Sequence, residues 1–150
     1  MQTFVPAGGD FELGFHALDY KRLGKQRVEA WQILNALRGV DNEGNPRKSN
    51  GWVNHPAVRM WKGHEVALSM YGMACCSVWM GRGYNDSMWG RFLKARNELA
   101  IAGKPIKPPE WLEDPKVALS HKSNLIRKLP SHYKKLWPDV PDDLPYVWPV

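Results

Sequence analysis

One stretch of the chain, from Leu18 to Leu37 (LDYKRLGKQRVEAWQILNAL), constrains the fold more than any other. Apolar side chains recur in its second half at steps of three: Val28, Trp31, Leu34 and Leu37. This spacing places them on one face of an α-helix, which is typical of a helix packed against a hydrophobic core. We therefore expect a core helix here.

The first half of the stretch carries a dense cluster of cations: Lys21, Arg22, Lys25 and Arg27. Gly24 lies among them, and a glycine inside a helical pattern predicts a break in the helix. A break would place the cations in a loop at a helix N-terminus, where unpaired N–H groups favour anions. The cluster is therefore interpreted either as a phosphate site or as an ordinary solvated basic face.

The charge distribution supports a basic functional face. The 150-residue chain has a net charge of +6 and a pI near 9.4, which favours phosphate-bearing partners. All 21 lysines and arginines lie between Lys21 and Lys135, so both ends of the chain are acidic. The length fits one domain with a sizeable core.

Helical patterns also dominate the remaining sequence, and strand-like alternation is nearly absent. We predict an all-α fold, a single compact helical domain over residues 1–150. A central buried helix is expected from Asn54 to about Met80, because it is apolar on nearly every side. Residues 138–150 should form an extended, proline-rich tail pinned by Tyr146 and Trp148. The first five residues are expected to form a short strand or an extended arm.

Polar residues at the starts of the apolar runs predict where helices begin. The expected caps are Asp10, His55 before Pro56, Asn85 or Asp86, and Asp114 before Pro115.

Several classes of protein are disfavoured by what the sequence lacks. Cys75 and Cys76 are neighbours in an apolar run, so no disulfide is expected and a reducing cytoplasm fits. Neither a signal peptide nor a run of about 18 apolar residues is present, so no membrane association is expected. The five histidines lack metal-ligand spacing, so we expect no metal and no cofactor.

Several motifs resemble the phage endonuclease V family, the pyrimidine-dimer DNA glycosylases. Segment 61–85 shares a Gly-His step at 63–64 and an Arg-Gly-aromatic-Asn sequence at 82–85, at similar spacing. The segment LPSHYKKLW and the Arg-Val step at 27–28 match as well. The whole chain resembles most closely a bacterial and phage branch of this superfamily, which carries RLGKQRVEA, NHPAVRMW, SHxSNLxRK and DDLPYVWP.

The resemblance implies a DNA base-excision-repair glycosylase and AP lyase. Family enzymes attack C1′ of the damaged nucleotide with the α-amine of their first residue, a threonine, and a carboxylate in the first helix assists. An α-amine has a pKa of about 8 against about 10.4 for lysine, so it is partly unprotonated at neutral pH. A Schiff base then permits strand cleavage by elimination.

Both catalytic positions of the family differ in this chain. The catalytic glutamate should fall at positions 22–24, where no acid stands, and the nearest carboxylates are Asp19 and Glu29. Gln2 is bulky and normally leaves the initiator methionine in place, so the attacking amine would belong to Met1 or to a lysine such as Lys25.

The candidate catalytic residues are Met1, Glu29 and His64. The candidate DNA- or phosphate-binding residues are Arg22, Lys25, Gln26, Arg27, Arg59, Arg82, His121, Asn124, Arg127 and Lys128. The expected partner is DNA or a nucleotide-like phosphorylated ligand, with no obligate protein partner. His64 is alternatively a hydrogen-bonded structural residue. Arg27→Ala is expected to weaken ligand binding with little loss of stability.

Three hypotheses on function remain open. The first is the glycosylase and lyase, and the second is a non-catalytic binder of DNA or of a phosphorylated ligand. The third is another nucleotide-directed enzyme with His121, Asn124 and Glu29 as its polar centre. Three tryptophans near basic residues are expected either to stack on bases or to pack in the core: Trp52, Trp61 and Trp89.

Overall fold

The computed structural model describes residues 1–49 and 51–150, and its regular structure is helical, as the sequence predicts. The helices are α1 (Phe11–Ala17), α2 (Tyr20–Arg38), α3 (Pro56–Arg59), α4 (Glu65–Gly81), α5 (Trp89–Ile101), α6 (Pro115–Lys128) and α7 (Pro130–Tyr133), with the 3₁₀ turns η1 (Gly51–Asn54) and η2 (Glu110–Glu113). The only β pairing among these residues is an isolated bridge between Val40 and Pro46. None of the described helices has the length and apolarity needed to cross a membrane.

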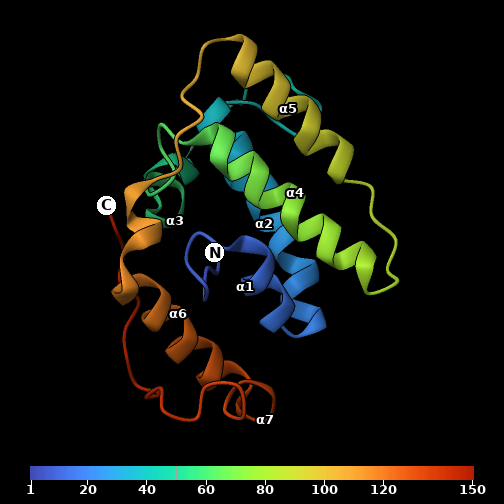
Figure 1. The fold of residues 1–150 in the computed structure, drawn as a ribbon. Coiled ribbons are helices and arrows are strands. Elements are labelled where there is room, and N and C mark those ends of the chain that lie inside the picture. The colour runs from blue at the N-terminus through green and yellow to red at the C-terminus, as the bar shows by residue number, and fades with distance from the viewer. Residues whose placement is uncertain (50) are drawn as a thin grey trace.

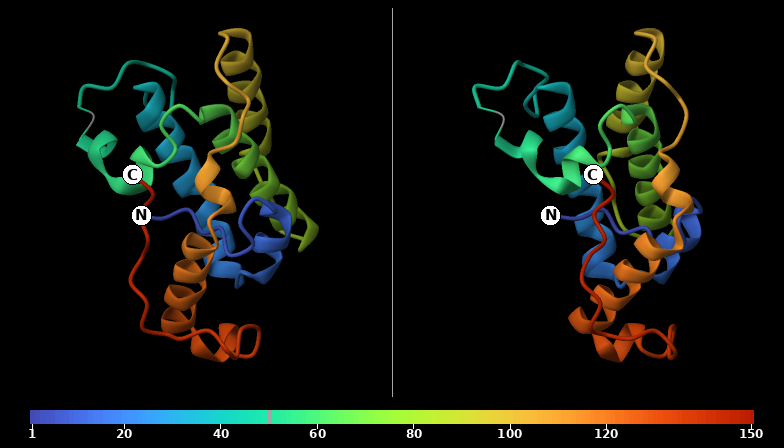
Figure 2. Two further views of the ribbon diagram at one scale, coloured as in Figure 1. Left: turned by 60° about the vertical axis from the view of Figure 1, so that its left-hand side comes forward. Right: turned by 90° about the vertical axis from the view of Figure 1, so that its left-hand side faces the viewer.

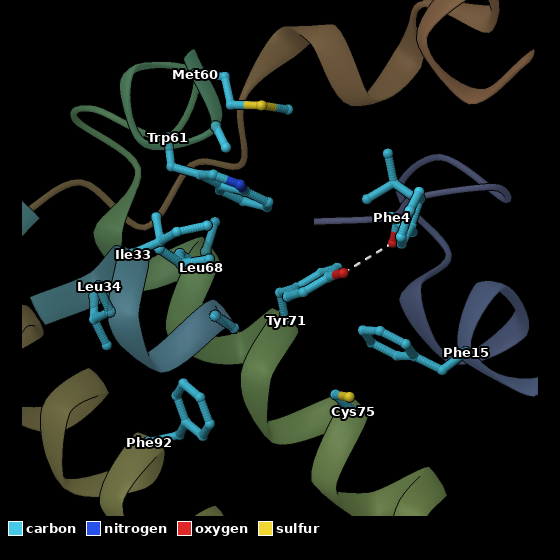
Figure 3. Packing of buried hydrophobic residues seen from close by; sticks show 14 of the residues in the cluster. Phe4, Phe15, Ile33, Leu34, Met60, Trp61, Leu68, Tyr71, Cys75 and Phe92 are labelled. Atoms are coloured by element: carbon cyan, nitrogen blue, oxygen red, sulfur yellow. Dashed lines mark hydrogen bonds between the residues drawn. The ribbon is translucent and has the colours of Figure 1, made fainter. Parts of the chain in front are cut away.

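Helix α4 lies at the centre of the fold and packs against α1, α2 and α5 (Figure 1). The packing is close, because a Cβ at Gly72 would lie 2.3 Å from the Phe92 ring of α5. Tyr71 is fully buried, with its ring centroid 4.7 Å from that of Phe15 (Figure 3). The predicted central buried helix is therefore confirmed, although its bounds differ.

The helix expected from Asn54 to Met80 is divided in two. Helix α3 ends at Arg59 and α4 begins at Glu65, and between them Gly63 has a φ of 83°, which glycine adopts most readily. The sequence is apolar on both sides of this break, so periodicity alone did not reveal it.

Helix α2 continues through Gly24, so the predicted break at that residue is wrong. Gly24 is required for packing instead, because a Cβ there would lie 2.9 Å from the ring of Trp79 on α4. The helix begins where the Asp19 carboxylate accepts the N–H of Arg22 at 3.4 Å. The basic cluster therefore lies along a helix surface and not in a loop.

The buried face of α2 also differs from the predicted stripe. Val28 is 43% exposed and Trp31 is half-buried, whereas Leu34 is fully buried. Two polar side chains, Gln26 and Glu29, are buried in addition. Their burial follows from the N-terminal segment, which lies against them.

The predicted caps at Asp10, His55 and Asp114 are confirmed, since each side chain accepts a backbone N–H at the start of its helix. At the start of α5, Asp86 accepts the N–H groups of Met88 and Trp89.

The C-terminal tail runs back along α6 to end near the first residues of the chain (Figure 2). The Leu144 N–H donates to Ser123 Oγ at 3.0 Å, which ties the tail to α6. The Tyr146 ring lies 6.4 Å from that of Phe4, and the Trp148 ring lies 6.1 Å from His55. The extended, pinned tail is therefore confirmed.

Candidate functional site

The first five residues form an extended arm that is buried against α2 and pairs with no strand in the part of the chain that the structure describes. Gln26 binds the arm on both sides of residue 3: its Nε2 donates to Gln2 O at 3.0 Å, and its Oε1 accepts the Phe4 N–H at 2.9 Å. The next N–H, of Val5, donates to His121 Nδ1 on α6 at 3.0 Å. Side chains thus satisfy the backbone groups that a neighbouring strand would otherwise bind.

The Glu29 carboxylate lies against the start of this arm. Its Oε2 accepts the Gln2 N–H at 3.3 Å and Gln26 Nε2 at 3.1 Å, while its Oε1 lies 3.6 Å from Lys25 Nζ. The Glu29 side chain is 11% exposed, against 71% for that of Lys25. One carboxylate oxygen is therefore held by hydrogen bonds from the protein, and the other lies beside a solvent-exposed cation.

A hollow of about 350 Å³ opens at this carboxylate. Its floor is one face of α2, because residues 22, 25, 26 and 29 follow the i, i+3, i+4, i+7 spacing of neighbours on a helix surface. The hollow brings together six of the predicted site residues: Met1, Arg22, Lys25, Gln26, Glu29 and Lys128. Four of its lining residues are cations: Lys21, Arg22, Lys25 and Lys128. The site therefore consists of the Glu29 carboxylate with four cations around it, beside the first residues of the chain.

Asp19 orients the cation at the rim of this hollow. Its Oδ1 lies 3.2 Å from Arg22 Nη1 and also accepts a short hydrogen bond from the Tyr133 hydroxyl. Burial raises the pKa of Asp19, but the hydrogen bonds from Tyr133 and Arg22 outweigh burial and leave the pKa below its ordinary value. Asp19 is thus an ionised anchor that holds Arg22 in place.

Two of the predicted phosphate-binding arginines are engaged elsewhere. Arg27 forms a short ion pair with Asp86, and its guanidinium lies 4.5 Å from the Trp79 ring centroid. Arg82 Nη2 donates at 3.1 Å to the carbonyl oxygens of Phe15 and His16, at the end of α1. Neither arginine lines the hollow at Glu29.

The predicted polar face of α6 anchors the two ends of the chain. Arg127 donates to Leu144 O at 2.9 Å and to Asn124 Oδ1, and Asn124 Nδ2 donates to the same carbonyl at 3.2 Å. His121 is fully buried, and burial lowers its pKa to about 3, so its imidazole is neutral while it accepts the Val5 N–H. A fully buried histidine is not accessible to a phosphate.

Two further candidates lie away from the hollow. His64 Nδ1 lies 3.1 Å from Lys107 O, in the connector after α5, and Arg59 is exposed on α3. The polar centre of the third hypothesis is not assembled, since neither His121 nor Asn124 lines the hollow that contains Glu29. The candidate cations and donors therefore do not all line this hollow.

Sequence reasoning did not select four residues that line the hollow: Gln2, Phe4, Lys21 and Tyr146. Lys21 belongs to the basic cluster, so its charge was a usable signal. Tyr146 reaches the site only because the tail runs back along α6, and no local pattern predicts that path. Among the described residues, no group of three or more His, Cys, Asp and Glu side chains could hold a metal ion.

Residues 1–89 match a family model described as pyrimidine dimer DNA glycosylase. The matched region contains the N-terminal arm and all of α2, and therefore every residue that lines the hollow except Lys128 and Tyr146. Comparisons with curated proteins and with solved structures gave no match.

Proposed function

Because the chain belongs to the pyrimidine dimer DNA glycosylase family, we propose that it is a DNA glycosylase and AP lyase acting on damaged or modified bases. The chemistry would take place in the hollow at Glu29. The observation that carries the proposal is the Glu29 carboxylate, held by Gln2 and Gln26 against the first residues of the chain and flanked by cations.

An amine beside Glu29 would start the reaction. Its lone pair forms a bond to C1′ of the damaged nucleotide, and the bond from C1′ to the base breaks, with its electrons leaving on the base, which takes up a proton. The attached nitrogen loses a proton and the sugar ring opens, which gives a Schiff base. Removal of a proton from C2′ then expels the 3′ phosphate, and water releases the amine. Glu29 stabilises the positive sugar and transfers these protons.

Two amines are available for the attack, the α-amine of Met1 and the ε-amine of Lys25, which lies 3.6 Å from Glu29 Oε1. An α-amine is ordinarily less basic than a lysine side chain, so a larger fraction is unprotonated at neutral pH. We therefore favour Met1 as the nucleophile.

The cations of the hollow would bind the phosphates on either side of the target nucleotide. Arg22 is the best placed, because Asp19 fixes its guanidinium. Lys128 approaches from α6, so the strand would pass between α2 and α6. Affinity that comes from such contacts falls as salt rises.

Binding without catalysis is the second candidate, and Arg22 is the observation that favours it. The family resemblance places the catalytic glutamate near this position, where the chain has a cation. Glu29 lies seven residues later, two helical turns along the same face. A protein in which Glu29 does not replace the missing acid would still hold DNA or a phosphorylated ligand through the same cations.

Trapping with sodium borohydride separates these candidates. The protein is incubated with a duplex that contains an abasic site and with one that contains a pyrimidine dimer, and borohydride reduces any Schiff base to a stable adduct. The proposal expects a covalent adduct, and mass spectrometry of its peptides identifies Met1 or Lys25 as the attached residue. Tight DNA binding without any adduct would support the non-catalytic binder instead.

A further inference from the structure

Three aromatic rings stack where the start of α2 meets the end of α4 (Figure 1). The ring centroids of Trp79 and Tyr84 are 4.2 Å apart with 22° between the ring planes, and those of Tyr84 and Tyr20 are 6.4 Å apart with 25° between the planes. Trp79 is half-buried, whereas Tyr84 is 41% exposed and Tyr20 is 53% exposed. This aromatic stack therefore ends in two rings that are open to solvent.

The protein fixes the inner end of the aromatic stack. The Trp79 Nε1–H donates to Asn85 O at 2.8 Å, and the Tyr84 N–H donates to Trp79 O at 3.4 Å. The Arg27 guanidinium covers the Trp79 ring, and Gly24 allows α2 to approach the same ring closely. Rings that are already held in place lose little conformational freedom when a further planar group stacks on them, so less binding energy is lost to ordering.

The tryptophans that the sequence suggested for base stacking form no such arrangement. Trp61 is fully buried, whereas Trp52 and Trp89 are 52% and 36% exposed. Neither exposed tryptophan forms a stacked pair with another ring in the part of the chain that the structure describes. Among the described residues, Tyr20 and Tyr84 are the only pair of stacked rings in which both rings are exposed. The sequence did not select either of them.

The aromatic stack begins one residue away from the cations of the hollow at Glu29. Tyr20 is the first residue of α2, and the next residue, Lys21, lines the hollow. Consecutive Cα atoms are about 3.8 Å apart, so a DNA strand held at Lys21 would bring its bases within reach of Tyr20. Lys25 is a neighbour of Lys21 on the helix surface, and its side chain is 71% exposed. Cations next to aromatic rings are typical of proteins that bind single-stranded nucleic acid.

We propose that Tyr20 and Tyr84 form a stacking platform for the unpaired bases of single-stranded DNA, whose phosphates bind Lys21 and Lys25. Bases inside a duplex are covered on both faces by their neighbours, whereas the bases of a single strand can stack on a side chain. The inference uses the phosphate-binding part of the proposed function and requires none of its chemistry. Every base has an aromatic face, so we expect the platform to bind with little preference among the bases.

The test compares two single strands of equal length and equal charge. The first is an oligothymidine, and the second is a chain of tetrahydrofuran abasic units, which carries the same phosphates without bases. The full-length protein should bind the first more tightly. In Tyr20→Ala this preference should fall by about tenfold or more, and in Tyr20→Phe most of it should remain, because phenylalanine also stacks.

Matched controls separate stacking from other effects. Ile106→Ala removes an exposed apolar side chain from the connector after α5 and should leave the preference unchanged. Lys21→Ala should weaken the binding of both strands about equally, because it removes a phosphate contact that both strands make. Tyr84→Ala changes a residue outside the helices and is a second variant if Tyr20→Ala does not fold. Equal affinity of the wild type for the two strands, or an unchanged preference in the folded tyrosine variants, would overturn the platform.

The platform and the glycosylase can fail separately, because binding is measured without turnover. Normal borohydride trapping together with a base preference that does not depend on Tyr20 would overturn only the platform. Absence of trapping together with a base preference that depends on Tyr20 would reject the glycosylase and retain the platform. Self-association of the chain that is lost in Tyr20→Ala, without any base preference, would assign the exposed rings to a protein contact and also overturn the platform.

Discussion

Two sets of cations on helix α2 look alike in the sequence and behave differently in the structure. Arg22 and Lys25 line the hollow at Glu29, and the Lys25 side chain is 71% exposed. Arg27 points to the other side of the helix, where it pairs with Asp86 and covers Trp79. Side chains two residues apart on a helix point about 200° away from each other, so the cations of residues 21–27 cannot all lie on one face. Proximity in sequence therefore says little about which cations meet a ligand.

The difference between the two sets is also electrostatic. The Arg27 side chain is 15% exposed and that of Asp86 is 1% exposed, so this pair is largely removed from solvent. The cations of the hollow have one oriented carboxylate partner each at most, and their remaining charge is open to a ligand. One set stabilises the fold and the other is available for binding.

Glu29→Gln should have the largest effect of any change in the hollow. An amide cannot take up or release the protons, so the rate of base excision should fall by about 10²–10⁴-fold. Glutamine still accepts the N–H groups of Gln2 and Gln26, so the melting temperature should change little. Single-turnover kinetics on dimer-containing DNA measures the first effect and thermal unfolding the second. Glu43→Gln, in the exposed loop, is the matched control, and full activity of Glu29→Gln would remove that residue from the chemistry.

Arg27→Ala tests the other set of cations and should act on stability. It leaves the Asp86 carboxylate buried without its cation, which costs about 2–3 kcal/mol once the partial exposure of Arg27 is allowed for. This prediction is the opposite of the one made from the sequence, which was weaker ligand binding with little loss of stability. Denaturant unfolding measures the loss, and Arg91→Ala on the exposed face of α5 is the control. Weaker DNA binding at unchanged stability would return Arg27 to the binding face.

Local signals predicted most of the fold. The carboxylates of Asp10 and Asp114 cap helices that begin at the next residue, so a short stretch of sequence is enough to predict them. The apolar sequence of α4 likewise indicates a buried helix without knowledge of the elements that pack against it. The break at Gly63 was missed because the apolar pattern continues past it. The predicted helix break at Gly24 was wrong because the ring that requires a glycine there belongs to Trp79, which lies 55 positions away in the sequence.

The candidate site was predictable only where one helix face defines it. Arg22, Lys25 and Glu29 share a face by helical spacing alone, so the sequence could group them. The partners of Arg27 and Arg82 lie 59 and 67 residues away, and those contacts exist only in the folded chain. Their positive charge made these arginines candidates for phosphate binding, but contacts with residues distant in the sequence determine which groups they bind.

Lys25→Ala should have a smaller effect than either earlier change and should appear mainly in the salt dependence of binding. The loss of one phosphate contact lowers the slope of log affinity against log salt by about one, almost independently of DNA sequence. Titration of duplex DNA at several salt concentrations measures the slope. Lys104→Ala removes an exposed cation from the connector after α5 and should leave the slope unchanged. Equal slopes in wild type and Lys25→Ala would remove Lys25 from the binding face.

The smallest expected effect is on stability at acidic pH. It distinguishes Asp19, which pairs with Arg22, from Asp86, which pairs with Arg27. Burial raises the pKa of Asp86, but hydrogen bonds from the N–H groups of Trp89 and Met88 and from Arg27 leave the pKa below 3.8. A lowered folded-state pKa means that the stability from Asp86 is fully present above pH 4 or so and is lost as pH falls through the lowered value.

The unfolding free energy of the wild type should therefore decrease below about pH 4, and that of Asp86→Asn should decrease less steeply. Asp19 has a lowered pKa as well, so Asp19→Asn should also flatten the curve, but it should in addition weaken DNA binding at neutral pH by releasing Arg22. Asp86→Asn weakens the pairing with Arg27, which lies outside the hollow, and should leave DNA affinity unchanged wherever the protein remains folded. An equal loss of affinity in the two variants would mean that both sets of cations contact DNA, and the division drawn along helix α2 would not hold.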